Sequence, residues 1–88
     1  MPHLQSNIPR SIFYSALVGE FLRIARSTLL LEDFLPRAKD LMKRMESQGA
    51  NIFISKRHLR KIVHDHPSNF LQFGINAEQL LDMVLSYQ

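Results

Sequence analysis

The stretch from Glu32 to Gly49 reads EDFLPRAKDLMKRMESQG, and its spacing decides the fold class. At about 100° per residue, its apolar side chains form one stripe about 120° wide, and charged residues cover the rest of the turn. Acids in the first turn interact favourably with the positive end of the helix dipole. We expect Pro36 to lie near that first turn, because deeper in the helix it would break a hydrogen bond. Gly49 is a natural C-terminal end for the helix. We therefore predict an amphipathic helix over residues 32–48. Its stripe consists of Phe34, Leu35, Ala38, Leu41, Met42 and Met45.

Similar patterns predict helices on both sides of this stretch. Residues 9–27 are apolar over roughly half of the helix circumference, so we expect this helix to pack against neighbours on two sides. A third helix is predicted over 56–66, followed by a short helical turn over 67–73. Asn76 and Gln79 have the spacing of a capping box, which places the start of a last helix.

These elements predict an all-α fold, a compact bundle of four to five short helices. The 88-residue chain suits a single helical domain, with residues 1–8 as an extended N-terminal segment. The short connection between the second and third helices, extended over residues 50–54, allows a helix-turn-helix arrangement. The expected core comprises Phe13, Leu17, Phe21, Phe34, Leu41, Met45, Leu59, Ile62, Leu80 and Val84.

The composition excludes several classes of site. The chain has no cysteine, so disulfides and thiolate metal sites are impossible. His64 and His66 lie about 200° apart on one helix and His58 faces elsewhere, so we expect no zinc site. No Ser–His–Asp set, glycine-rich phosphate loop or carboxylate pair is present. We expect no enzyme activity, no cofactor and no small-molecule substrate.

Hydropathy indicates the compartment. No apolar run reaches the roughly 20 residues of a membrane-spanning helix. The first residues have neither the basic start nor the apolar stretch of a signal peptide. We expect an intracellular protein, nuclear or cytoplasmic, with no membrane partner.

Charge is segregated along the chain. Residues 37–61 contain eight Lys and Arg against two acids, whereas residues 62–88 contain three acids and no Lys or Arg. Residues 1–36 are balanced, with three of each. A basic segment of this kind favours an anionic partner.

The third helix concentrates this charge on one arc. Like charges this close repel, and a polyanion would relieve the repulsion and release counterions as it bound. No acid lies inside the arc, and no Asn or Gln lies there to recognise adenine edges, although Arg57 and Arg60 could reach guanine. We therefore predict sequence-independent binding to the phosphate backbone of DNA or RNA. The alternatives are a merely solvated face, or binding to anionic lipid or an acidic protein. The arc consists of Lys56, Arg57, Arg60, Lys61 and His64.

The basic residues of the second helix are open to two interpretations. Lys39 and Lys43 would extend the basic patch of the third helix. Alternatively, this is a solvated face on which much of the charge is paired locally at i,i+3 or i,i+4 spacing. The pairs expected in that case are Asp33–Arg37, Asp40–Arg44 and Lys43–Glu46.

Residues 8–49 resemble the region that follows the catalytic core of Penelope-like reverse transcriptases, found in animal retroelements. The resemblance covers an Ile-Pro-x-Ser start, a segment with two nearby arginines, an acidic–aromatic pair and an Ala-x-x-Leu helix that ends in glycine. Residues 50–88 share only the general character. The matching stretches are Ile8-Pro9-Arg10-Ser11, Glu20-Phe21-Leu22-Arg23-Ile24-Ala25-Arg26, Glu32-Asp33-Phe34 and Ala38-Lys39-Asp40-Leu41.

This resemblance implies a helix-turn-helix-type domain beside a polymerase, where the thumb holds the template–primer duplex. Such a domain binds and does no chemistry, and this chain has no Asp-Asp pair. Arg23 and Arg26 match the paired arginines, which implies contacts with the nucleic-acid backbone. The alternative is that they pair with Glu20 or with acids of the second helix.

A rival function belongs to a different class. The acidic C-terminal third, or an apolar groove near Phe70 and Phe73, would instead serve a protein–protein interaction. The two functions differ in their response to salt, which weakens phosphate binding steeply and apolar docking little.

Overall fold

The computed structural model describes residues 10–47 and 56–88, except for the side chains of 10–13. Four α-helices lie within these ranges: α1 (Arg10–Arg26), α2 (Leu31–Ser47), α3 (Lys56–Asp65) and α4 (Ala77–Ser86). Two 3₁₀ turns, η2 (Pro67–Asn69) and η3 (Leu71–Phe73), join α3 to α4. The all-α class is confirmed, and each predicted helix is present to within one or two residues. The extended connection expected over 50–54 and the stop expected at Gly49 lie outside the described residues.

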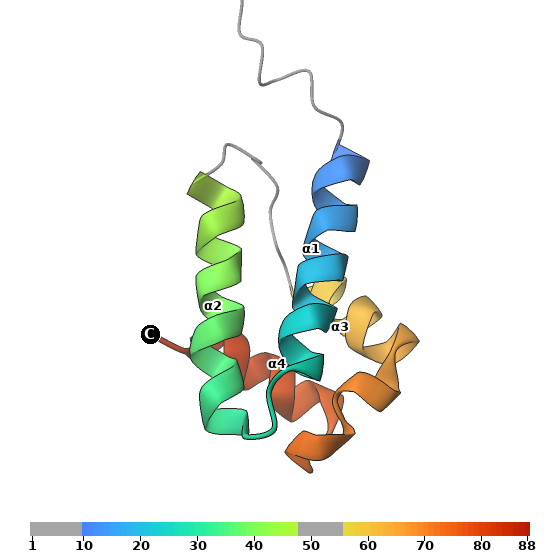
Figure 1. Ribbon diagram of the computed structural model, residues 1–88, viewed down its shortest axis with the longest axis vertical. Coiled ribbons are helices and arrows are strands. Elements are labelled where there is room, and N and C mark those ends of the chain that lie inside the picture. The colour runs from blue at the N-terminus through green and yellow to red at the C-terminus, as the bar shows by residue number, and fades with distance from the viewer. Residues whose placement is uncertain (1–9, 48–55) are drawn as a thin grey trace, which may run out of the picture.

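The helices pack mainly in pairs, α1 with α2 and α3 with α4, and α4 also contacts α2. Figure 1 shows α1 and α2 side by side and antiparallel, with α4 crossing behind them. In the same view α3 lies on the other side of α1 from α2.

One apolar core joins all four helices, the 3₁₀ turn η3 and Phe70, which lies between η2 and η3. Four phenylalanine rings meet at its centre, where the ring centroids of Phe34 and Phe73 are 4.7 Å apart and those of Phe21 and Phe34 are 5.6 Å apart. Phe70 contacts both Phe21 and Phe34. Phe13 lies outside the described side chains, and the other nine expected core residues are confirmed as buried: Leu17, Phe21, Phe34, Leu41, Met45, Leu59, Ile62, Leu80 and Val84.

Side chains satisfy the carbonyl groups at the end of α1. The buried Thr28 hydroxyl donates to the carbonyl oxygen of Ile24 at 2.7 Å. The side-chain amide of Gln72 donates to the carbonyl oxygens of Ala25 (2.8 Å) and Thr28 (3.1 Å). Because the last carbonyls of a helix lack intrahelical partners, these bonds fix the end of α1 and attach η3 to it.

Local sequence signals set the start of α4 and the position of Pro36. The Asn76 side chain accepts from the backbone N–H of Gln79 at 2.8 Å, and the Gln79 side chain accepts from the backbone N–H of Asn76, so the capping box is confirmed. Gly74 precedes it at φ 68°, a conformation that favours glycine. Pro36 is the sixth residue of α2, near the first turn as expected, and the helix continues through it to Ser47.

Candidate nucleic-acid interface

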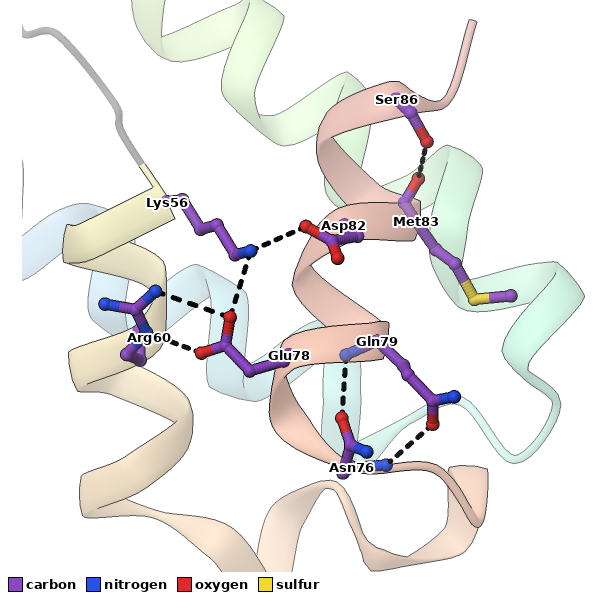
Figure 2. Close-up of polar contacts among 8 residues, drawn as sticks. All are labelled: Lys56, Arg60, Asn76, Glu78, Gln79, Asp82, Met83 and Ser86. Carbon is purple, nitrogen blue, oxygen red and sulfur yellow. Dashed lines mark hydrogen bonds and ion pairs between the residues drawn. The ribbon is translucent and has the colours of Figure 1, made fainter.

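Two of the four permanent charges on the α3 arc face acidic side chains of α4. Lys56 Nζ lies 2.6 Å from an Asp82 carboxylate oxygen and 2.9 Å from one of Glu78. Arg60 Nε donates to the other Glu78 oxygen at 2.6 Å. Figure 2 shows the three charged groups of Lys56, Arg60 and Glu78 drawn together between the two helices. The expectation that all four cations would point outward without acidic neighbours is therefore wrong, because α4 packs beside α3 and brings its carboxylates to this edge of the arc.

The pKa values of this network follow from the ion pairs. The hydrogen bond from Arg60, followed by that from Lys56, lowers the pKa of Glu78 to about 2. The hydrogen bonds to Asp82 and Glu78 raise the pKa of Lys56, and the bond to Glu78 raises that of Arg60. At neutral pH all of these groups are charged, so an incoming phosphate would have to compete with two carboxylates for Lys56 and Arg60.

This network predicts a pH dependence of stability. Because the pKa of Glu78 falls from 4.5 in the unfolded chain to about 2 in the folded one, its contribution is present above about pH 4.5 and is lost as the pH falls towards 2. Urea unfolding between pH 6 and pH 2 should therefore show a steeper loss of stability for the parent than for Glu78→Gln. The lowered pKa of Glu20, which arises mainly from its hydrogen bond to Arg23, acts equally in both proteins. Parallel pH curves for the two proteins would contradict the pairing.

The remaining residues of the arc form an exposed face, which we call the outward face of α3 and define as Arg57, Lys61 and His64. Their i, i+4, i+7 spacing places them one above another, and all three are exposed. Arg57 has no carboxylate within 4 Å in residues 10–47 and 56–88, and Lys61 lies 3.4 Å from Asp65. This face therefore keeps the basic character that the sequence predicts for the whole arc.

His58 and His66 lie away from this face. The His58 ring packs against Tyr14 of α1, with centroids 5.9 Å apart. His66 is partly buried just after the end of α3. Among the described residues no group of three His, Asp or Glu side chains is placed to hold a metal ion. None of the described helices combines the length and the apolar character that crossing a bilayer requires.

Arg23 and Arg26 both lie on the exposed side of α1. Arg23 pairs with Glu20, which its Nη2 approaches to 2.7 Å, so the alternative of a local ion pair is confirmed for Arg23. Arg26 has no carboxylate within 4 Å in the part of the chain that the structure describes. Arg26 therefore retains an unneutralised charge.

Lys39 and Lys43 do not join the outward face of α3. Lys39 is partly buried, and its Nζ donates to the carbonyl oxygen of Leu85 at 2.9 Å, near the end of α4. Lys43 is exposed on α2, which lies on the other side of α1 from α3 in Figure 1. Lys39 is therefore engaged by α4, the helix that also holds Lys56, and Lys43 remains exposed on α2.

Only one of the three local pairs expected on α2 forms. Arg44 Nε donates to Asp40 at 3.1 Å, which confirms that pair. Arg37 instead donates through Nη1 to the Thr28 hydroxyl at 3.0 Å, because the end of α1 lies closer to it than the exposed Asp33 does. The expected Asp33–Arg37 and Lys43–Glu46 pairs are wrong, since neither is among the ion pairs of the described residues.

The described surface includes an apolar hollow and an arginine-lined one. The first, which we call the apolar hollow, has a volume of about 600 Å³ and lies where α3, the 3₁₀ turns and the start of α4 meet. Phe70 lines it, whereas Phe73 packs against Phe34 in the core. The second, the arginine hollow, has a volume of about 230 Å³ and lies between α1 and α2. It is lined by Arg23, Ile24, Ser27, Arg37, Asp40 and Arg44.

Sequence reasoning missed the arginine hollow, although a signal for it was present. Arg37 and Arg44 are seven residues apart, and Arg23 and Ser27 are four apart, so each pair shares one face of its helix. Interpreting Arg37 and Arg44 only as partners of local acids concealed this arrangement. The missing information was that these two faces lie against each other.

The chain matches no protein-family model, no curated protein and no solved structure.

Proposed function

We propose that this domain binds nucleic acid through the phosphate backbone, without sequence preference and without chemistry of its own. The observation that carries the proposal is the outward face of α3, where Arg57 and Lys61 stand one turn apart with Asp65 as the one carboxylate within 4 Å in the described chain. Arginine and lysine on an exposed helix face are the side chains with which proteins contact phosphates. The resemblance to the region after the core of Penelope-like reverse transcriptases supports the same role.

The structure lowers the number of phosphate contacts that we expect. Lys56 and Arg60 are held by Glu78 and Asp82, so they contribute less than unpaired cations would. Two contacts from the outward face would give a slope of log affinity against log salt near −1.8 for a duplex. Any steeper slope requires contacts elsewhere on the surface.

Replacing Arg57 with Ala tests the proposal. We expect weaker binding to all sequences by a similar factor, and a slope flattened by about 0.9 for duplex DNA, because one phosphate contact is lost. Fluorescence anisotropy with two labelled duplexes of unrelated sequence, from 50 to 200 mM NaCl, measures both quantities. Lys43→Ala is the matched control, since it removes the same charge from an exposed site on α2, which lies on the other side of α1 from α3 in Figure 1.

Either of two binding results would overturn the proposal. If the parent binds neither duplex nor single-stranded oligonucleotide at low salt, the outward face is only solvated. If Arg57→Ala and Lys43→Ala weaken binding equally, the net charge matters and this face does not.

The apolar hollow supports a second candidate, a protein–protein interaction. It is lined by apolar side chains such as Val63, Phe70 and Leu80, and Leu71 at its edge is 74% exposed. The acidic C-terminal third is a weaker candidate for the interaction surface, because its Glu78 and Asp82 carboxylates already pair with Lys56 and Arg60 of α3. A partner docked in the hollow would bind with little dependence on salt, and Leu71→Asp would weaken that binding while leaving oligonucleotide binding intact.

A further inference from the structure

The arginine hollow brings three guanidinium groups to one place between α1 and α2. Arg23 comes from the exposed side of α1, and Arg37 and Arg44 come from the adjacent side of α2, two turns apart. Because the two helices lie side by side, the three side chains line a single hollow of about 230 Å³. Asp40 is the one carboxylate among the lining residues.

The charges around this hollow are not fully neutralised. Arg23 pairs with Glu20 beside the hollow, and Arg44 pairs with Asp40. Arg37 has no carboxylate within 4 Å in residues 10–47 and 56–88, and its one hydrogen bond there is to the neutral hydroxyl of Thr28. Three guanidinium groups and two carboxylates leave one formal positive charge.

Arg37 is also well held. Its Nη1 donates at 3.0 Å to the Thr28 hydroxyl, which in turn donates to the carbonyl oxygen of Ile24. Thr28 is 2% exposed, so this anchor is fixed by the core. A guanidinium carries five N–H donors, and the bond to Thr28 uses one. Those that remain can hydrogen-bond an anion while the group keeps its orientation.

The chemistry of these side chains selects the ligand class. Guanidinium groups bind tetrahedral oxyanions with paired N–H···O bonds, and Arg is preferred over Lys where such geometry matters. The Ser27 hydroxyl already donates to the carbonyl oxygen of Ile24 at 3.1 Å, so the arginines are the principal donors. A structural role is the competing explanation, because a cation near the end of α1 would favour its dipole.

We propose that the arginine hollow binds one phosphate group of a nucleic-acid backbone, with Arg37 as the principal contact and Arg44 and Arg23 assisting. The inference rests on the proposed function and deepens it by adding a second contact region, on the α1–α2 side of the molecule. It accounts for the role of Arg37, which has no acidic partner among the described residues.

The test uses the full chain and two probes, inorganic phosphate and the single-stranded oligonucleotide (dT)10. Phosphate is titrated against chloride at constant ionic strength while NMR follows the arginine Nε–H signals. We expect saturable shifts at Arg37 and Arg44 in the parent, and the shift at Arg44 should be abolished by Arg37→Gln and weakened by Arg37→Lys. Arg37→Gln should also flatten the salt slope for (dT)10 by about 0.7. Lys43→Gln, which removes an exposed charge that does not line the hollow, is the control and should leave the shifts at Arg37 and Arg44 unchanged.

Thr28→Val separates binding from structure, because it removes the hydrogen bond to Arg37 and retains the guanidinium. If the hollow binds phosphate, Thr28→Val still shows saturable shifts at Arg37. If Arg37 only supports the end of α1, phosphate shifts no arginine signal in the parent, and Arg37→Gln and Thr28→Val lower Tm alike. That result overturns the proposal.

The two proposals fail in different ways. If the parent binds (dT)10 but phosphate causes no saturable shift, the arginine hollow does not bind phosphate. The proposed function of the domain is then unaffected. If phosphate causes saturable shifts but the parent binds neither (dT)10 nor duplex DNA at low salt, the hollow is an anion site and the nucleic-acid function is wrong. Equal salt slopes for Arg37→Gln and the parent show that nucleic acid does not use this hollow.

Discussion

Replacing Phe34 with Ala should unfold a large fraction of this domain at room temperature. Phe34 is completely buried, and its ring contacts those of Phe21, Phe70 and Phe73, so the substitution removes the shared member of three aromatic contacts. Truncation of a buried Phe costs about 3–5 kcal/mol, through lost transfer free energy and the cavity that remains. An 88-residue domain has a total stability on the order of 5 kcal/mol. The loss therefore approaches the whole free energy of unfolding.

Thermal and urea unfolding followed by far-UV circular dichroism measure this effect. A loss of 3 kcal/mol or more corresponds to a fall in Tm of more than about 12 °C for a domain of this size. Leu29→Ala is the matched control, because Leu29 is 78% exposed and its truncation should change stability by less than about 0.5 kcal/mol. A loss below about 1 kcal/mol for Phe34→Ala would show that the four rings do not form a packed centre.

The features that sequence predicted correctly depend on neighbours within one or two turns. The apolar stripe of α2 sets which of its side chains are buried, and Phe34, Leu41 and Met45 are all in the core. The capping box of α4 joins Asn76 to Gln79, three residues away. Such signals are complete within a short segment, so they can be recognised without knowing how the helices pack.

The features that sequence did not predict depend on which helix faces which. The angular position of Lys56 on α3 was correct, but its partner Asp82 is 26 residues away. Nothing within the α3 segment indicates that α4 packs along this edge of the arc. Arg37 shows the same limit, since it contacts Thr28 across the α1–α2 corner and not Asp33 one turn earlier. A basic arc on one helix is thus an incomplete description of a basic surface.

The carboxylates of α4 give the second prediction of large effect. Asp82 pairs with Lys56 and Glu78 pairs with Arg60, each with a carboxylate oxygen 2.6 Å from the cation. These carboxylates take the positions that phosphate oxygens would take in a complex with nucleic acid. The double substitution Glu78→Gln and Asp82→Asn should free both cations for nucleic acid. If each then contacts one phosphate, the salt slope for duplex DNA becomes steeper by about 1.8, and affinity at low salt rises correspondingly.

The same substitutions remove the ion pairs between α3 and α4, so stability has to be followed alongside binding. Exposed ion pairs contribute little to stability, and the apolar contacts of Leu59, Ile62 and Leu81 continue to hold the two helices together. We therefore expect the double variant to stay folded, with the helical circular dichroism of the parent. Anisotropy titrations from 50 to 200 mM NaCl then give the slope for each protein.

The control variant is Glu32→Gln with Glu46→Gln, which changes the net charge by the same amount at two exposed acids that form no ion pair among the described residues. A general effect of net charge raises the affinity of both double variants equally and leaves the number of contacts unchanged. Freed phosphate contacts instead steepen the slope in the Glu78/Asp82 variant alone. If the two variants have the same slope as the parent, Lys56 and Arg60 do not reach nucleic acid, and binding is confined to other basic side chains such as those of the outward face of α3 and the arginine hollow.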